Sequence, residues 1–483
     1  MSDSLIEKSG AAAVDLAKIS GVTYADCRVV HQTEEQISVR NGATETLSRA
    51  ESIGLGVRVL VDGCWGFASS AELTPESATE LRDHAVEIAR ASGKLAGERV
   101  NLEPVRGVVA SYRTPIVKNP FEIPLKEKLD FAGHLDALLR AQEGLNQTSV
   151  AMSFERERRF FFSSEGSKID QEIFRSGAGM TAGIGGGHGN AVERSYPTSG
   201  GQYETAGYEL LERLQLEAGI DKIAEEARAL MQAPECPQKT CTLVLSGDLV
   251  SLQVHESIGH PLELDRVYGS ERNFSGTSFA TPDHLGKLRY GSELVNVSAD
   301  PTAAGGLGSF AFDDEGMPAK NSPLIVNGLL VGYLTSRETA PRIGAVSNAS
   351  MRAKSWAYLP LIRMTNIVLA PGDKTLKQMI AETDDGIYIQ TPTTWSIDDR
   401  RENFQLGGEI GWLITGGKLG AVVKNPVYSG NTVEFWNSCD AIGTAAEYRI
   451  WGTPSCGKGQ PGQTIATGQG TAPARFTNVK IGG

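Results

Sequence analysis

Two histidines five positions apart, in the stretch His255-Glu-Ser-Ile-Gly-His260, constrain the local fold of this chain more than any other feature. In an ideal α-helix, side chains at i and i+5 point about 140° apart, whereas those at i and i+4 differ by about 40°. A regular helix therefore cannot bring both imidazoles to one point. Gly259 tolerates unusual backbone dihedrals, and Pro261 lacks the N–H that a regular turn would use. We expect the helix to unwind here or to form a single π-type turn that realigns the rings.

Two imidazoles and a carboxylate in so short a stretch are typical of zinc hydrolases. In the related H-E-x-x-H helix, both histidines bind the metal and the glutamate acts on the water that zinc activates. By analogy, His255 and His260 are candidate ligands and Glu256 is a candidate general base. Coincidence is the competing interpretation, because such a string arises by chance roughly once in a hundred or more proteins of this composition.

A catalytic zinc needs a third protein ligand. The downstream Gly-x-x-His of metzincins is missing from the sequence, so the fold must bring in a remote side chain. Cys456 is attractive because its small neighbours Ser455 and Gly457 allow a close approach. Position along the chain does not separate it from three other candidates, which are Cys439, Cys241 and His284.

Length and charge narrow the class of protein. A chain of 483 residues with 40% hydrophobic residues is long enough for two or three domains. It has no run of eighteen apolar residues, and its first twenty residues resemble a charged amphipathic helix rather than a signal peptide. We therefore expect a cytoplasmic protein with no membrane partner. A net charge of -12 without a basic cluster also disfavours a nucleic-acid partner.

The patterning divides the chain near residue 235, where two prolines within 233–238 end a helix. For residues 1–235 we predict an N-terminal α/β domain with an antiparallel sheet and flanking helices. Asn41-Gly42 and Asp62-Gly63 are strong hairpin signals. The expected helices cover about 3–20, from 74–76 onward, 125–142 and 207–232. The expected strands cover 25–31, 35–40, 54–61, 64–69, 147–154, 159–163 and 168–175.

Residues 236–483 are expected to form a β-rich domain, so the whole chain is predicted to be α+β. A strand at 240–245 leads into a helix from about Gly247 that carries the metal motif. Many short strands with Gly-rich turns follow, which favours an antiparallel sandwich or barrel. The acidic run 313–316 is interpreted as a turn rather than a cation site. The glycine-rich run 184–189 is expected to be a loop, with His188 in solvent.

The longer string His255-Glu-Ser-Ile-Gly-His260-Pro-Leu-Glu-Leu-Asp265 resembles the signature helix of the TldD/PmbA family of metallopeptidases, in its catalytic TldD-type branch. The similarity extends over nearly the whole chain. Further matching segments lie at 54–59, 66–69, 313–316, 348–352, 363–366 and 456–460. The resemblance implies zinc (Zn2+) bound by His255, His260 and Cys456, with Glu256 as the catalytic base.

The same resemblance implies a substrate and a partner. Family members hydrolyse unfolded or small peptides, including leader peptides of peptide natural products, and they act as dimers. The expected state is a homodimer or a heterodimer with a TldE/PmbA-type subunit that lacks the metal motif. Pro261 stands where glycine is usual, and this departure bears on substrate choice. The alternatives are an amide hydrolase acting on a small metabolite and a non-catalytic partner protein with a structural metal.

Overall fold

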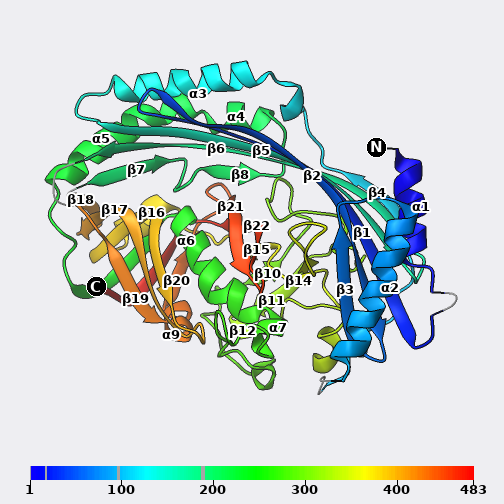
Figure 1. The fold of residues 1–483 in the computed structure, drawn as a ribbon. Helices are drawn as coiled ribbons and strands as arrows, with labels where there is room; N and C mark the ends of the chain where they lie inside the picture. Colours follow the sequence, from blue (N-terminus) through cyan, green and yellow to red (C-terminus); the bar gives the residue numbers. More distant parts are fainter. Residues whose placement is uncertain (1, 17–18, 95–97, 186–190, 483) are drawn as a thin grey trace.

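The computed structural model describes residues 2–16, 19–94, 98–185 and 191–482, and within these ranges the strands form four sheets. The largest, here called the N-terminal sheet, is built from strands β1 to β8. Its order is β3 (Cys64–Ser70), β2 (Ala43–Val61), β1 (Val22–Arg40), β5 (Gln147–Ser163), β6 (Lys168–Ile184) and β4 (Val109–Arg113), with β7 (Val192–Tyr196) and β8 (Gln202–Glu204) also paired to β6. Its long strands curve as an arch over the rest of the chain (Figure 1).

Strand β1 is one continuous strand, although the sequence predicted a break between 25–31 and 35–40. The polar residues in the supposed gap, Gln32 and Glu34, line a polar cavity on the inner face of the arch instead of forming a turn. The predicted turns Asn41-Gly42 and Asp62-Gly63 are confirmed, and all four residues have positive φ.

Helices cover the outer face of the N-terminal sheet in two groups (Figure 1). At one end α1 (Asp3–Ala13) and α2 (Pro75–Ser92) pack on apolar side chains such as Cys27 and Val57. At the other end α3 (Leu125–Arg140), α4 (Glu209–Leu214) and α5 (Ile220–Gln232) pack on side chains such as Ile37 and Met152. The sheet thus has one apolar face, toward the helices.

Two predicted helices differ from those observed. The helix expected over 207–232 is split, because Gln215 takes a left-handed conformation between α4 and α5. The helix expected over 3–20 ends at Ala13, and residues 17 and 18 of that range lie outside the described residues. His188 and most of the loop around it also lie outside them.

The inner face of the arch is charged and contacts the C-terminal half. Arg58 forms ion pairs with Asp26 at 2.7 Å and with Glu315 at 3.5 Å. Arg159 pairs with Asp314. The acidic run 313–316 is a turn, as predicted, and its three carboxylates are almost completely buried under the arch.

The C-terminal half contains a barrel and a six-stranded sheet. Strands β9 (Lys239–Leu245), β16 (Asp385–Ile397), β17 (Asn403–Thr415), β19 (Val427–Asn431) and β23 (Ala474–Ile481) pair in a closed ring, with β18 (Lys418–Val423) and β20 (Cys439–Ile442) added at its side. The six-stranded sheet has the order β12 (Leu329–Leu330), β11 (Ser322–Val326), β10 (Val297–Ala299), β15 (Asn366–Leu369), β22 (Gln463–Thr471) and β21 (Arg449–Lys458). Strands β13 (Met351–Arg352) and β14 (Leu361–Ile362) form a small hairpin-like pair, and α8 (Leu376–Ala381) and α9 (Thr432–Asn437) cover the barrel.

Helix α6 (Gly247–Val254) lies between the barrel and the six-stranded sheet and leads directly into the histidine motif. Its side chains Leu249, Val250 and Val254 are fully buried in the core that the two sheets share. The predicted α+β class, with a β-rich, barrel-like C-terminal region, is confirmed. In the described part of the chain, no helix is long and apolar enough to span a membrane.

Candidate metal centre

Helix α6 changes its winding at the first histidine. Residues His255–Gly259 form a π-helical turn, and the 3₁₀ turn His260–Leu262 follows. The N–H of His260 donates to the carbonyl of His255, five residues earlier. The two rings consequently lie 4.9 Å apart, at 84° to each other. Of the two departures from a regular helix expected from the five-residue spacing, unwinding or a π-type turn, the structure shows the π-type turn.

Buried side chains satisfy the polar groups of this turn. The carbonyl of Ser257 accepts a hydrogen bond from the Tyr290 hydroxyl, and the Ser257 Oγ accepts one from Trp436 Nε1 at 2.9 Å. Both aromatic residues are fully buried. A Cβ on Gly259 would lie 2.0 Å from the Met364 Sδ, so the turn needs glycine at this position for space. Contacts with buried core residues therefore stabilise the turn.

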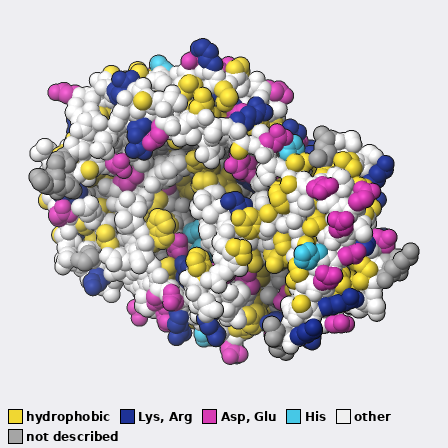
Figure 2. Space-filling view, viewed as in Figure 1, with side chains coloured by type: hydrophobic (Ala, Val, Ile, Leu, Met, Phe, Trp, Pro, Cys, Tyr) yellow, Lys and Arg dark blue, Asp and Glu magenta, His cyan; other side chains and the backbone are white. Residues whose placement is uncertain are grey.

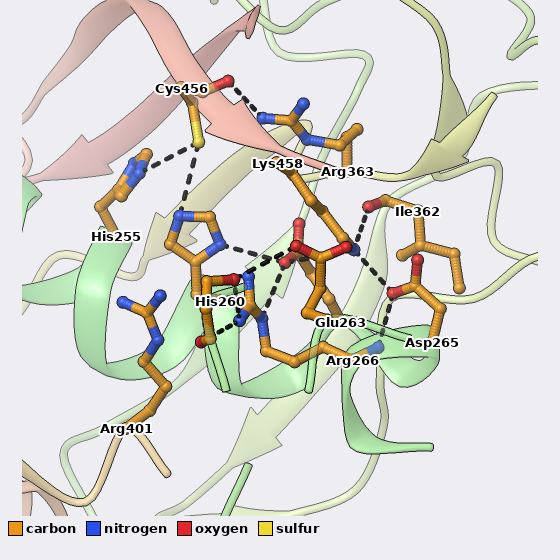
Figure 3. A network of polar contacts seen from close by, with 12 residues as sticks. His255, His260, Glu263, Asp265, Arg266, Ile362, Arg363, Arg401, Cys456 and Lys458 are labelled. Atoms are coloured by element: carbon orange, nitrogen blue, oxygen red, sulfur yellow. Dashed lines mark hydrogen bonds and ion pairs between the residues drawn. The ribbon is translucent and has the colours of Figure 1, made fainter. Parts of the chain in front are cut away.

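Strand β21 brings a thiol to the two imidazoles. The Cys456 Sγ lies 3.4 Å from the His255 Nε2 and 3.5 Å from the His260 Nε2 (Figure 3). The three donor atoms lie within 4.8 Å of one another, and all three residues are buried. A tetrahedral zinc with Zn–S near 2.3 Å and Zn–N near 2.05 Å separates S from N by about 3.5 Å. The observed spacing fits that geometry.

A break in strand register explains why Cys456 reaches the histidines. The pairing of β21 with β22 shifts between Thr453 and Cys456, which bends the strand at this point. The other candidates from the sequence, Cys439, Cys241 and His284, are not part of this group. Within the described residues, no second cluster of three His, Cys, Asp or Glu side chains has a comparable spacing.

The ring nitrogens that face away from the cluster are also hydrogen-bonded. The His255 Nδ1 lies 3.0 Å from the Gln469 Nε2, and the His260 Nδ1 lies 3.0 Å from the Glu263 Oε2. Glu263 is fully buried and lies 3.4 Å from the Nζ of Lys458, which is also buried. These contacts fix the ring orientations, as the outer partners of metal-binding histidines do.

Electrostatics favour the forms of these side chains that bind metal. Burial raises the pKa of the Cys456 thiol, but the charge and hydrogen bond of His260, together with the charge of Arg363, hold the pKa below its ordinary value. Burial lowers the pKa of His255, so its ring stays neutral. Burial raises the pKa of Glu263, yet Lys458 and His260 bring it well below its ordinary value. These shifts favour the thiolate form of Cys456, the neutral imidazole of His255 and the charged carboxylate of Glu263.

Glu256 points into a cleft of about 410 Å³ next to the donor set. Burial raises its pKa, but His260, His255 and Arg401 together lower the pKa below its ordinary value. Its Oε2 accepts a hydrogen bond from the Arg401 Nη1 at 2.8 Å. The space-filling view shows that the molecule is hollowed near the middle of the face turned to the viewer (Figure 2). The cleft is lined by Thr198, Ser199, Ser251, Leu252, His255, Glu256, His260, Pro392, Thr393, Trp395, Arg401, Trp451, Gly452, Thr453, Ser455, Cys456 and Gly457.

Several residues of the site escaped the sequence interpretation. Glu263 lies three positions after His260, a spacing at which two side chains of a helical turn meet, and this signal was available. Gln469, Lys458 and Arg401 are each more than 100 residues away from the histidine motif, and no local pattern marks them.

A buried His/His/Cys set beside a carboxylate, open to a cleft, is typical of a metal-dependent hydrolase. Three family profiles match the chain: PmbA/TldA metallopeptidase domain 1 at residues 25–90, the central domain at 118–231 and the C-terminal domain at 238–483. The chain belongs to the PmbA/TldD family and is a metallopeptidase.

Relatives with similar sequences span nearly the full length. A metalloprotease of Methanocaldococcus jannaschii is 30% identical over 92% of this chain and 94% of its own. A metalloprotease of Synechocystis is 30% identical over 96% of each chain. A zinc metalloprotease TldD homolog of Saccharolobus solfataricus is 23% identical over 96% of this chain and 97% of its own.

Solved structures share the fold. A protein of Thermotoga maritima described as a modulator of DNA gyrase aligns with a TM-score of 0.78 at 18% identity, covering 99% of this chain and 100% of its own. TldE of Thermococcus kodakarensis aligns with a TM-score of 0.74 at 18% identity, with the same coverage.

Proposed function

We propose that this chain is a zinc-dependent peptidase that cleaves unfolded or small peptides, in the manner of a TldD-type catalytic subunit. His255, His260 and Cys456 hold the zinc, and Glu256 is the general base. The observation that carries the proposal is the spacing of the three donor atoms, all within 4.8 Å, beside a carboxylate that faces a cleft.

The donor set supports zinc in particular. A thiolate with two imidazoles suits zinc, whereas Mg²⁺ and Ca²⁺ prefer oxygen ligands. The Saccharolobus relative is named a zinc metalloprotease. Three protein ligands leave a fourth position open, as in catalytic rather than structural sites. When bound, zinc supplies a Lewis acid that polarises a carbonyl and makes water acidic.

The residues of the chain supply the proton transfers. Glu256 is charged at neutral pH because its pKa is lowered, so it can accept a proton from the attacking water. The water oxygen adds to the peptide carbonyl carbon, the C–N bond breaks, and Glu256 passes the proton to the leaving nitrogen. Glu263 and Gln469 keep the two rings in place throughout.

We also propose a cellular compartment, a partner subunit and domain limits for this chain. We place the protein in the cytoplasm, because the six cysteines, all of them described, are free thiols. We propose a dimer, with a second copy or with a TldE-type subunit, since the Thermococcus TldE structure has the same fold. We propose domain limits of 1–235 and 236–483, and the gap between the central and C-terminal profiles, 231 to 238, supports them.

Metal content and peptide hydrolysis, measured on the same samples, test the function. The purified chain should bind about one zinc and cleave an unstructured peptide, and a chelator should abolish the cleavage. Glu256→Gln should keep the zinc and lower the turnover by about 10²- to 10⁴-fold. Cys456→Ala should lose most of the zinc, while Cys439→Ala, a buried cysteine away from the site, should keep it.

Undiminished turnover by Glu256→Gln would reject the base, and full zinc content in Cys456→Ala would reject the third ligand. Hydrolysis of small amides without any cleavage of peptides would point to a metabolite amidase. Protein that binds zinc but hydrolyses nothing, even with a TldE-type subunit added, would indicate that the metal has a structural role only.

A further inference from the structure

The first half of strand β2 is a free edge of the N-terminal sheet. Strand β3 pairs with β2 only from Leu55 to Val61, so residues 43–54 have β1 on one side and, within the described part of the chain, no strand on the other. Residues 43–52 are exposed, apart from the half-buried Thr46. Such an edge presents unpaired N–H and C=O groups to which another strand can add.

We infer that this edge pairs with the same edge of a second copy of the chain, in an antiparallel arrangement centred on Ala50. The inference rests on the dimer proposed above and names the surface that forms it. A two-fold axis through Ala50 joins the two N-terminal sheets into one continuous sheet.

The sequence of the edge is complementary to itself about Ala50. In the segment Leu47-Ser-Arg-Ala-Glu-Ser-Ile53, this pairing places Arg49 opposite Glu51 of the partner subunit, twice in the dimer. Opposed side chains of an antiparallel pair have Cβ atoms about 4.5–5.5 Å apart, so opposite charges attract and like charges repel. A centre on Arg49 or on Glu51 would oppose like charges, so the charges favour Ala50. The remaining pairs are then Leu47 with Ile53 and Ser48 with Ser52.

The side chains that would meet lie on one accessible face. Alternation along β2 places residues 47, 49, 51 and 53 on the outer face, where Leu47 is opposite Ile37 of β1. Helix α3 packs on the buried Ile37 but leaves Leu47 49% exposed. A second strand would therefore cover an apolar side chain that α3 leaves in water.

The two charged side chains of this face can each take a further partner. Arg49 has 54% of its side chain exposed and one ion pair, at 3.4 Å to Glu35. A guanidinium has five N–H donors, which leaves room for a second carboxylate. Glu51 is 67% exposed and has a single contact, at 2.5 Å to His31, while a carboxylate accepts at two oxygens.

The fold limits the free edge to a segment that is symmetric about Ala50. Ser38 pairs with Thr46 but Val39 pairs with Thr44, so Glu45 is the extra residue of a bulge that bends β2. At the other end, β3 occupies the edge from Leu55 onward. The regular free edge is therefore 46–54. In the dimer, the bend at the bulge carries the end of the β1–β2 hairpin away from β3 of the second copy.

Charge reversal tests this surface, with the mass of the full-length chain measured by sedimentation. Arg49→Glu and Glu51→Arg each create two like-charge pairs across the axis, and each should raise the dissociation constant of the dimer about 10- to 100-fold. An equimolar mixture of the two variants restores two opposite-charge pairs and should dimerise almost as tightly as the wild type. Glu293→Arg, at a side chain 82% exposed and outside this edge, should change nothing.

A single cysteine on the axis tests the register. Directly opposed residues of an antiparallel pair have Cα atoms about 4.5–5.5 Å apart, within the range of a disulfide. Ala50→Cys should therefore form a covalent dimer on mild oxidation. Ser48→Cys is the matched control, because its two copies would lie roughly 13 Å apart and should not cross-link. The wild type, whose cysteines are buried except for the half-buried Cys236, gives the background.

The outcomes separate the surface from the dimer and from the peptidase. A wild-type dimer that Arg49→Glu does not weaken, or that cross-links through Ser48→Cys and not through Ala50→Cys, would overturn the inference and leave the dimer on another surface. A wild-type chain that stays monomeric at micromolar concentration would overturn the inference and the homodimer, and binding of a TldE-type subunit by that monomer would leave only the heterodimer. Zinc content and peptide hydrolysis of the same samples report on the peptidase independently.

Discussion

At the scale of single residues, the centre is organised by side chains that never touch the metal position. The carboxylate of Glu263 ties the ring of His260 to two buried cations, Lys458 at 3.4 Å and Arg266 at 3.4 Å. Lys458 also donates to Asp265 at 2.7 Å, so the network runs from β21 back to the motif segment (Figure 3). A buried charge network of this kind keeps a ring in one tautomer and one orientation.

Glu263→Gln should therefore weaken zinc binding although the three donors remain. The amide keeps the shape of the side chain but removes the negative charge that supports His260 and balances Lys458. We expect zinc affinity to fall about 10- to 100-fold, measured by competition with a chromogenic chelator. Glu293→Gln, at a residue whose side chain is 82% exposed, is the control. Equal affinity in wild type and Glu263→Gln would show that the contact is incidental.

Whether a residue of the site could be recognised from the sequence depends on how far it lies from the histidine motif along the chain. His255, Glu256 and His260 are close in sequence, and their chemistry could be recognised from spacing alone. The sequence did not distinguish Cys456 from three other candidate ligands. Its approach to the histidines depends on a bend in β21 that no local sequence pattern predicts. Arg401 lies 145 residues after Glu256 and could be assigned only from the fold.

At the scale of elements, the π turn is the feature that converts a five-residue spacing into a common binding point. Such a turn leaves backbone groups without their usual helical partners. Here the Tyr290 hydroxyl donates a hydrogen bond to the Ser257 carbonyl. Burial raises the pKa of Tyr290 well above its ordinary value, so the hydroxyl keeps its proton and remains a donor. Buried side chains around α6 therefore stabilise the π turn.

Tyr290→Phe should destabilise the π turn without changing the volume of the core. It leaves the Ser257 carbonyl buried and without that donor, which costs about 1–3 kcal/mol. We expect a lower thermal midpoint for the metal-free protein and weaker zinc binding. Tyr268→Phe, at a residue that is 38% exposed, should change neither quantity. An unchanged midpoint in Tyr290→Phe would mean that water or another donor satisfies the carbonyl.

Element boundaries followed from the sequence where turn chemistry is local. Helix α2 begins where the sequence predicted, at 74–76, and Thr74 caps it by accepting the Ser77 N–H at 3.0 Å. The break at Gln215 was missed, since nothing in its residue type demands a left-handed conformation. Closure of the barrel depends on β16 pairing with both β9 and β17, a long-range choice that alternation of side chains cannot specify.

At the scale of the whole molecule, the arch contributes directly to the cleft. Thr198 and Ser199, between β7 and β8, line the cleft together with barrel residues such as Pro392 and Trp395. Thr198 Oγ1 donates to Asp248 of α6 at 2.9 Å, and Arg194 of β7 pairs with Glu409 of β17 at 2.6 Å. The site is complete only when the N-terminal sheet sits on the C-terminal half, so contacts between them bear on activity as well as stability.

Substitution of Asp314 tests how strongly the N-terminal sheet is held on the C-terminal half. It is 1% exposed, pairs with Arg159 of the arch and accepts the Ala353 N–H at 2.7 Å. Burial raises its pKa, but Arg159 and Arg28 outweigh burial and bring the pKa below its ordinary 3.8. Asp314→Asn leaves buried guanidinium charge unbalanced, and we expect a loss of about 3–5 kcal/mol at pH 7, visible as a lower thermal midpoint.

The pH dependence of that loss has a definite sign. With its pKa lowered in the folded state, Asp314 binds its proton more readily when the chain is unfolded, so its stabilisation is complete above about pH 5 and is lost as the pH falls through the ordinary value of 3.8 and then the lowered value. The gap in thermal midpoint between wild type and Asp314→Asn should therefore be constant from pH 7 to pH 5 and shrink below pH 4. Asp130→Asn, which removes an exposed pair with Lys126, should show almost no gap at any pH. A gap that widens on acidification would contradict a charged Asp314 under the arch, because it would require a raised pKa in the folded state.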